Sequence, residues 1–211
     1  MLYFLIFISA IFVNNIVLSQ FLGICPFLGV SKKIDTALGM SAAVAFVLTV
    51  ATVVTYLLQQ LLVKMCQGIF GDPTTFLFLQ TILFILVIAA LVQMIEIVLK
   101  KVSPSLYQAL GVFLPLITTN CCILGVALIV ADSEQLLQKL PGDGALSANL
   151  LTGTLYALAT AIGFGLALVL FAGIREQLAL AKVPKAMQGT PIALLTAGLL
   201  ALAFMGFSGV V

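Results

Sequence analysis

A cysteine interrupts a long apolar run in the stretch FLGICPFLGVSKK, residues 21–33. Pro26 follows Cys25 directly, Gly29 comes three residues later, and two lysines close the stretch. About ninety residues further on, LITTNCCILGV at 116–126 repeats the pattern Cys-x-x-Leu-Gly-Val. A thiol beside helix-breaking residues therefore occurs twice in apolar surroundings, and this pair of stretches determines how the chain is interpreted.

The composition places the chain in a lipid bilayer. Of its 211 residues 63% are hydrophobic and 8% are charged, and the mean hydropathy is +1.31, whereas soluble domains are about 25% charged. A membrane-spanning helix needs roughly 20 apolar residues. The sequence predicts one all-α membrane domain, residues 1–211, with six transmembrane helices at Leu2–Val30, Ala37–Val63, Phe76–Leu99, Tyr107–Ala131, Leu146–Ala172 and Ile192–Val211.

The basic residues predict how these helices are oriented. The loops between helices one and two, three and four, and five and six carry seven Lys or Arg residues, against two on the opposite side. Basic loops stay in the cytoplasm. We therefore expect both termini on the periplasmic side. The seven residues are Lys32, Lys33, Lys100, Lys101, Arg175, Lys182 and Lys185; the other two are Lys64 and Lys139.

The repeated pattern predicts two related halves, about 1–103 and 104–211. Aligning Cys25 with Cys121 also aligns Gly29 with Gly125, each near the start of a three-helix block. Because three is odd, the second block must cross the membrane upside down, as in inverted-repeat transporters with broken helices. Helices one and four are expected to be broken, with Pro26, Gly29 and Gly125 shaping the breaks.

The cysteines allow several interpretations. A buried free cysteine often acts only as a small hydrophobe, which is what we expect of Cys66 and Cys122. The repeat selects Cys25 and Cys121 as candidate metal or cofactor ligands, because Cys122 aligns with Pro26. Thiolates bind zinc, copper(I) or iron–sulfur clusters; a [2Fe–2S] cluster takes four cysteines, so two would come from a partner chain. A disulfide between the two is the structural alternative.

Two further features carry expectations. The polar residues within predicted helices one and four, which are Asn14, Asn15, Thr118, Thr119 and Asn120, can bind backbone groups freed at a helix break or line an ion path. The segment 173–182, GIREQLALAK, mixes charged and apolar residues. It is expected to form a short helix lying at the membrane surface.

Four motifs give the chain a family resemblance: VNNIVL at 13–18, the stretch at 21–33, FLPLITTNC at 113–121 and AFMGFSG at 203–209. Over essentially its whole length it resembles the RnfA family, membrane components of the Rnf electron-transport complex. The resemblance implies six helices in inverted halves, in a multi-pass protein of the bacterial inner membrane. It also implies a homologous partner, RnfE, and the further components RnfB, RnfC, RnfD and RnfG.

The same resemblance implies a function. A chain of this family and RnfE would share one intramembrane [2Fe–2S] cluster, with Cys25 and Cys121 as this chain's ligands and no flavin or nicotinamide site of its own. The chain would be a non-catalytic electron relay in a ferredoxin/NAD oxidoreductase that translocates Na⁺ or H⁺. The alternatives are the similar protein NqrE of a Na⁺-translocating NADH:quinone reductase, or a non-redox inverted-repeat transporter or channel.

Overall fold

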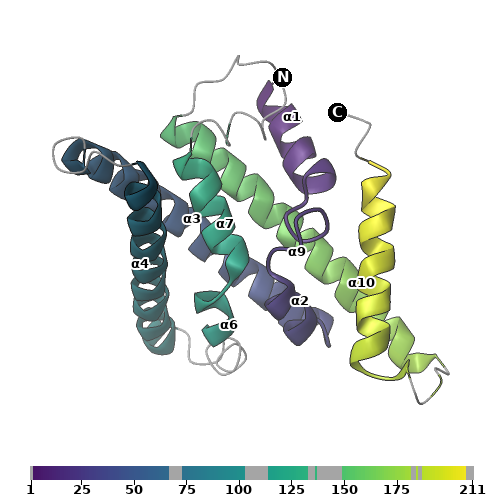
Figure 1. Ribbon diagram of the computed structural model, residues 1–211. Helices are drawn as coiled ribbons and strands as arrows, with labels where there is room; N and C mark the ends of the chain where they lie inside the picture. The colour runs from purple at the N-terminus through teal and green to yellow at the C-terminus, as the bar shows by residue number, and fades with distance from the viewer. Residues whose placement is uncertain are drawn as a thin grey trace.

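The computed structural model describes residues 2–66, 73–102, 114–132, 136, 149–181, 184 and 187–207, and this part of the chain is helical without strands. Figure 1 shows its helices side by side in one bundle. They are α1 (Leu2–Ile8), the π-helix η1 (Ser9–Val13), α2 (Ile24–Val30), α3 (Ile34–Cys66), α4 (Pro73–Val102), α6 (Leu114–Thr118), α7 (Cys121–Ala131), α9 (Leu150–Leu180) and α10 (Thr190–Met205).

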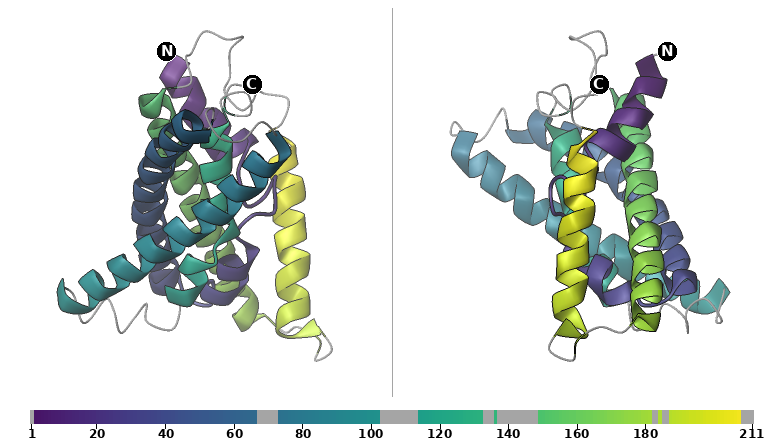
Figure 2. Two further views of the ribbon diagram at one scale, coloured as in Figure 1. Left: turned by 60° about the vertical axis from the view of Figure 1, so that its left-hand side comes forward. Right: turned by 90° about the vertical axis from the view of Figure 1, so that its right-hand side faces the viewer.

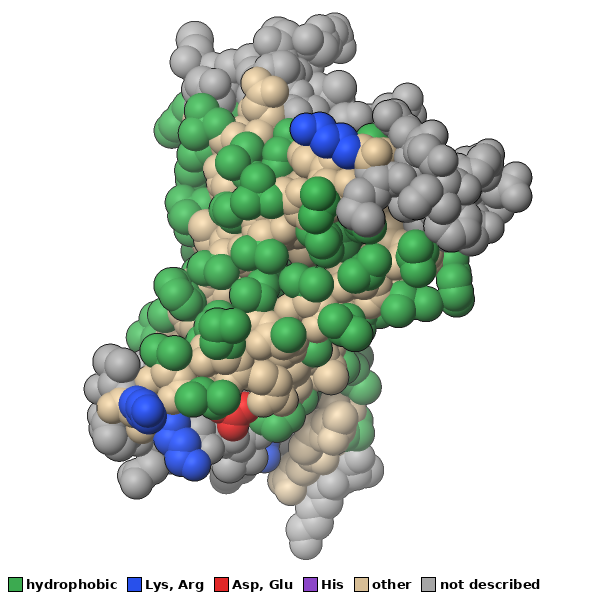
Figure 3. Space-filling view, turned by 90° about the vertical axis from the view of Figure 1, so that its left-hand side faces the viewer, with side chains coloured by type: hydrophobic (Ala, Val, Ile, Leu, Met, Phe, Trp, Pro, Cys, Tyr) green, Lys and Arg blue, Asp and Glu red, His purple; other side chains and the backbone are tan. Residues whose placement is uncertain are grey.

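Three of the described helices are long and apolar enough to cross a membrane. They contain the segments Ile34–Lys64, Phe78–Val98 and Leu150–Leu180, which confirm predicted helices two, three and five. The other three predicted helices correspond to shorter apolar helical segments, Phe4–Val13, Pro115–Ala131 and Thr190–Met205. Figure 3 shows a broad apolar surface with basic side chains near its two ends, as a lipid-facing wall requires.

The predicted boundaries need two corrections. The fifth helix does not end at Ala172, because α9 continues unbroken to Leu180. The separate surface helix expected at 173–182 was therefore wrong. Gly173 causes no break, since one glycine costs a helix only about 1 kcal/mol and the residues after it are good helix formers. The predicted stretches 107–113, 146–148 and 208–211 lie outside the described residues.

Helices α3 and α9 form the centre of the bundle. They pack along each other over much of their length, and α7 lies against α3. Figure 2 shows α4 tilted steeply relative to the other helices, and it packs against α3, α6 and α7, while α10 stands alongside α9. Large side chains fill the interior, and Met40, Leu48, Phe84, Phe164 and Phe171 are all fully buried. A close-packed interior of this kind holds the shorter segments in fixed positions.

Segments that the sequence repeat pairs with each other run in opposite directions. In Figure 1, α3 ends at the end of the bundle where α9 begins, so these two helices run in opposite directions. The same is true of α4 and α10 and of α2 and α7. An inverted repeat requires this. The two-fold relation between the halves stays a prediction, because opposite directions alone do not define a symmetry axis.

Candidate functional site

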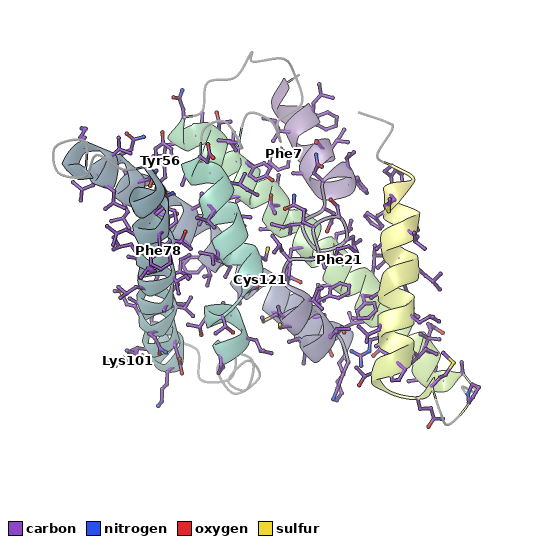
Figure 4. The ribbon with its side chains drawn as sticks, viewed as in Figure 1. Phe7, Phe21, Tyr56, Phe78, Lys101 and Cys121 are labelled. Carbon is purple, nitrogen blue, oxygen red and sulfur yellow. The ribbon has the colours of Figure 1, made fainter. Side chains whose placement is uncertain are left out.

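Both cysteines of the repeat lie where a predicted transmembrane segment is broken. The first segment ends its π-helix at Val13, runs without regular structure through 14–23, and resumes as α2 at Ile24. The fourth is interrupted between α6, which ends at Thr118, and α7, which begins at Cys121. Cys25 is thus in the first turn of α2, and Cys121 is the first residue of α7. Figure 4 places Cys121 near the middle of the bundle's height.

The breaks do not occur where the sequence pattern suggested. Pro26 is the third residue of α2, a first-turn position where its missing N–H costs no helical hydrogen bond. Gly29 and Gly125 lie inside α2 and α7. Gly125 allows close contact between the breaks, whereas a side chain at Gly29 would meet its neighbour at an ordinary distance. A Cβ on Gly125 would lie 2.7 Å from Cδ1 of Leu22, and one on Gly29 would lie 3.4 Å from Cδ1 of Leu116.

Gly23 makes the turn into α2. It precedes the helix with φ +82°, a left-handed conformation that glycine adopts without steric cost, and Phe21 two residues earlier has φ +56°. A Cβ on Gly23 would also lie 3.0 Å from Cε2 of Phe164 and 3.2 Å from Cβ of Cys122. Both the backbone angle and the surrounding space therefore exclude a side chain at this position.

A hydrogen bond joins the two breaks at the cysteines. The backbone N–H of Gly23 donates to Sγ of Cys121, with 3.0 Å between nitrogen and sulfur. Cys25 follows Gly23 by two residues, which is at most about 7 Å of chain. The structure therefore brings the two predicted site cysteines into one region, although 96 positions separate them in the sequence.

The side chains of the cysteines differ in accessibility. Cys25 and Cys121 are exposed free thiols, whereas Cys122 is buried and also free, with an exposed fraction of 0%. No disulfide joins these three residues; the side chain of Cys66 lies outside the described residues. Adjacent helical residues point about 100° apart, which explains why only one member of the Cys121–Cys122 pair faces outward.

The donor set fits half of a thiolate-bound site. The described residues contain no group of three or more Cys, His, Asp or Glu side chains that could hold a metal ion, so a four-thiolate site needs ligands from outside them. Cys25 and Cys121 are soft ligands of the type that iron–sulfur clusters use. Because both are exposed, ligands from a neighbouring chain can reach the same group.

Two buried asparagines hold the broken backbone in place, as the sequence predicted. Asn15 accepts hydrogen bonds from the N–H groups of Val17 and Leu18 and donates to the carbonyls of Ile11 and Gly163. Asn120 caps α7, because its Oδ1 accepts the N–H of Cys122 at 3.1 Å. Such bonds replace the helical partners that the chain loses at a break.

Arg175 positions α2, a role that the sequence did not reveal. Its Nη1 donates to the carbonyl of Leu28 and to Oγ of Ser31, both at 2.8 Å, and so satisfies groups at the C-terminal end of the helix that carries Cys25. Phe27 of α2 stacks on Phe171 of α9 with ring centroids 4.3 Å apart. The one signal available was that Arg175 is the single arginine of the chain.

We expect Arg175→Gln to loosen α2. Hydrogen bonds from a charged donor contribute about 1.5–3 kcal/mol each, and Arg175 makes two at the end of a short helix. A loss of about 1–3 kcal/mol in unfolding free energy should appear as a lower midpoint in thermal unfolding of the detergent-solubilised protein. The matched control is Glu176→Gln on the adjacent exposed residue, which should stay within about 0.5 kcal/mol of wild type. Equal midpoints for the two variants would contradict this role.

Comparisons with known proteins agree with this architecture. Residues 3–211 match the family model described as "Rnf-Nqr subunit, membrane protein". The chain is 56% identical to the A subunit of the Na⁺-translocating ferredoxin:NAD⁺ oxidoreductase complex of Acetobacterium woodii, over 97% of this chain and 95% of that protein. It is 53% identical to the A subunit of the ion-translocating oxidoreductase complex of Syntrophotalea carbinolica, over 98% and 96% of the two chains.

Proposed function

Because the chain belongs to the Rnf-Nqr family of membrane-protein subunits, we propose that it is the RnfA component of an Rnf-type ion-translocating oxidoreductase complex. In that role it relays electrons within a bacterial inner membrane and catalyses no reaction on its own. The names of the relatives support this assignment, since they describe the A subunits of such complexes. The bias of basic residues toward one set of loops supports an orientation with both termini on the periplasmic side.

The proposed relay site is formed by Cys25 and Cys121. One observation carries it: two free, exposed thiols of a membrane protein lie at helix breaks that a hydrogen bond joins. Each would be one of four thiolate ligands, the other two coming from a homologous partner such as RnfE. When bound, a [2Fe–2S] cluster supplies one-electron transfer.

The residues around the thiols hold them in fixed positions. Cys121 is the first residue of the eleven-residue helix α7. The Gly23 N–H adds a direct hydrogen bond to its sulfur. The stacked rings of Phe27 and Phe171 fix α2 on α9. Together these contacts hold two ligands in place before a partner chain binds.

The test is to purify the chain together with its homologous partner. We expect a coloured complex with about two iron and two sulfide ions per pair of chains, as a [2Fe–2S] cluster requires, and an EPR signal after reduction with dithionite. A correctly assembled complex without colour, iron or signal would overturn the relay and favour a non-redox transporter.

In membranes containing the whole complex, ferredoxin-dependent NAD reduction is expected rather than quinone reduction, and its dependence on sodium separates Na⁺ from H⁺ coupling.

A further inference from the structure

The side chain of Asn120 has an unused hydrogen-bond donor. Asn120 is 3% exposed, and its Nδ2 has no hydrogen-bond partner among the described residues. The assignment of the two amide atoms is fixed, because the N–H of Cys122 must donate to an acceptor and therefore faces Oδ1. An unsatisfied buried donor costs about 1–3 kcal/mol. Buried polar groups in native proteins rarely lack a partner, so this amide group requires an explanation.

Capping α7 does not explain the choice of asparagine. A serine, threonine or aspartate would serve as well, since an N-cap needs only an oxygen acceptor. Asn15 at the other break is satisfied, and its Nδ2 donates to two carbonyls. The NH₂ group of Asn120 is thus an additional feature of this cap, beyond what the helix needs.

The amide belongs to the residue next to the thiol in the chain. Asn120 precedes Cys121, and its Oδ1 is 3.2 Å from the position that a Cβ on Gly23 would take. Gly23 is the residue whose N–H already donates to Sγ of Cys121. One N–H donor is therefore bonded to the sulfur, and a second donor, on the preceding residue Asn120, is buried without a partner among the described residues.

We propose that the Asn120 side chain donates a hydrogen bond to Sγ of Cys121 once that sulfur is a ligand, and that with the Gly23 N–H it raises the reduction potential of the group that the sulfur holds. This inference rests on the proposed function. Reduction adds negative charge to the sulfur atoms, so hydrogen-bond donors stabilise the reduced form more than the oxidised form. The effect is strong in a low-dielectric interior. Asn120 is a positioning and tuning residue and not itself a ligand.

The test separates tuning from capping with Asn120→Ser, which keeps an acceptor oxygen for the N–H of Cys122 and removes the NH₂ group. In the purified two-chain complex, we expect the ratio of reduced to oxidised cluster at a fixed potential to fall about tenfold, a shift of about 59 mV for one electron, together with altered EPR g-values. Thermal unfolding should change little, because the cap remains. Thr119→Ser is the matched control; its exposed hydroxyl bonds to the carbonyl of Pro115, so potential and g-values should stay at wild-type values.

The outcomes distinguish the two proposals. A cluster of unchanged potential and g-values in Asn120→Ser would overturn the tuning role and leave the relay intact. A wild-type complex without a cluster would overturn the relay itself. If the serine variant does not assemble, pulsed EPR of the reduced wild-type complex, grown with asparagine carrying ¹⁵N in the side-chain amide, decides the question. A hyperfine coupling from an asparagine side chain supports the proposal, and its absence overturns it.

Discussion

Replacing Cys25 or Cys121 with serine is expected to abolish the cluster signal of the purified two-chain complex. Each thiol would be one of four ligands, and a serine oxygen is a poor substitute for a soft thiolate. Both side chains are exposed, so neither serine creates a buried unpaired hydroxyl. We therefore expect the variants to fold and to co-purify with the partner while losing iron, visible absorption and the EPR signal.

Cys122→Ala provides the matched control for these variants. Cys122 adjoins Cys121 but is fully buried, and alanine avoids placing a hydroxyl in its apolar surroundings. Its iron content and EPR signal should equal those of wild type. Loss of the cluster in Cys122→Ala, or its retention in Cys121→Ser, would show that the sequence repeat selected the wrong thiol.

The second large effect is expected from Gly23→Ala. An alanine held at φ +82° costs about 1–2 kcal/mol, and its Cβ would lie 3.0 to 3.2 Å from atoms of Phe164, Asn120 and Cys122. Overpacking of this kind typically costs a further 1–3 kcal/mol or so. We expect a markedly lower midpoint in thermal unfolding. We also expect less cluster to be retained, because the displaced N–H can no longer reach the sulfur of Cys121.

Gly173→Ala is the control for Gly23→Ala. Gly173 lies within α9, and a Cβ there would meet no atom within 4 Å. Alanine should stabilise this helical position by up to about 1 kcal/mol. If both variants unfold at the wild-type temperature, the turn at Gly23 tolerates a side chain and its proposed role at the junction is wrong.

The positions of the long helices could be predicted from the sequence because they depend on a local property, the length of an apolar run. Helices α3 and α4 each begin and end three residues beyond the predicted limits. The breaks were harder to place, because Pro26 and Gly29 attract attention as breakers but are compatible with the first turn and the interior of α2. The break is defined by the left-handed turn at Gly23. A sequence pattern does not distinguish a glycine in such a turn from a glycine within a helix.

The candidate site likewise combines features that the sequence could predict with contacts that it could not. Choosing Cys121 over Cys122 required only the register of the repeat, and the exposure of the two side chains agrees with that choice. The hydrogen bonds from Gly23 to Cys121 and from Arg175 to Leu28 join residues 98 and 147 positions apart. Contacts over such distances depend on how the segments pack, and one sequence read without relatives contains no signal for them.

The hydrogen bond between the two helix breaks also joins parts of the protein that are synthesised at different times. The helical part of its first segment before the break is the twelve residues of α1 and η1, about 18 Å long at 1.5 Å per residue, which is shorter than the bilayer core of about 30 Å. After this part, the N–H of Gly23 is bonded to Cys121, which comes 98 residues later. At about 5–20 residues per second, a ribosome needs roughly 5–20 seconds to deliver that partner. The N–H of Gly23 is therefore synthesised well before the sulfur atom that accepts its hydrogen bond.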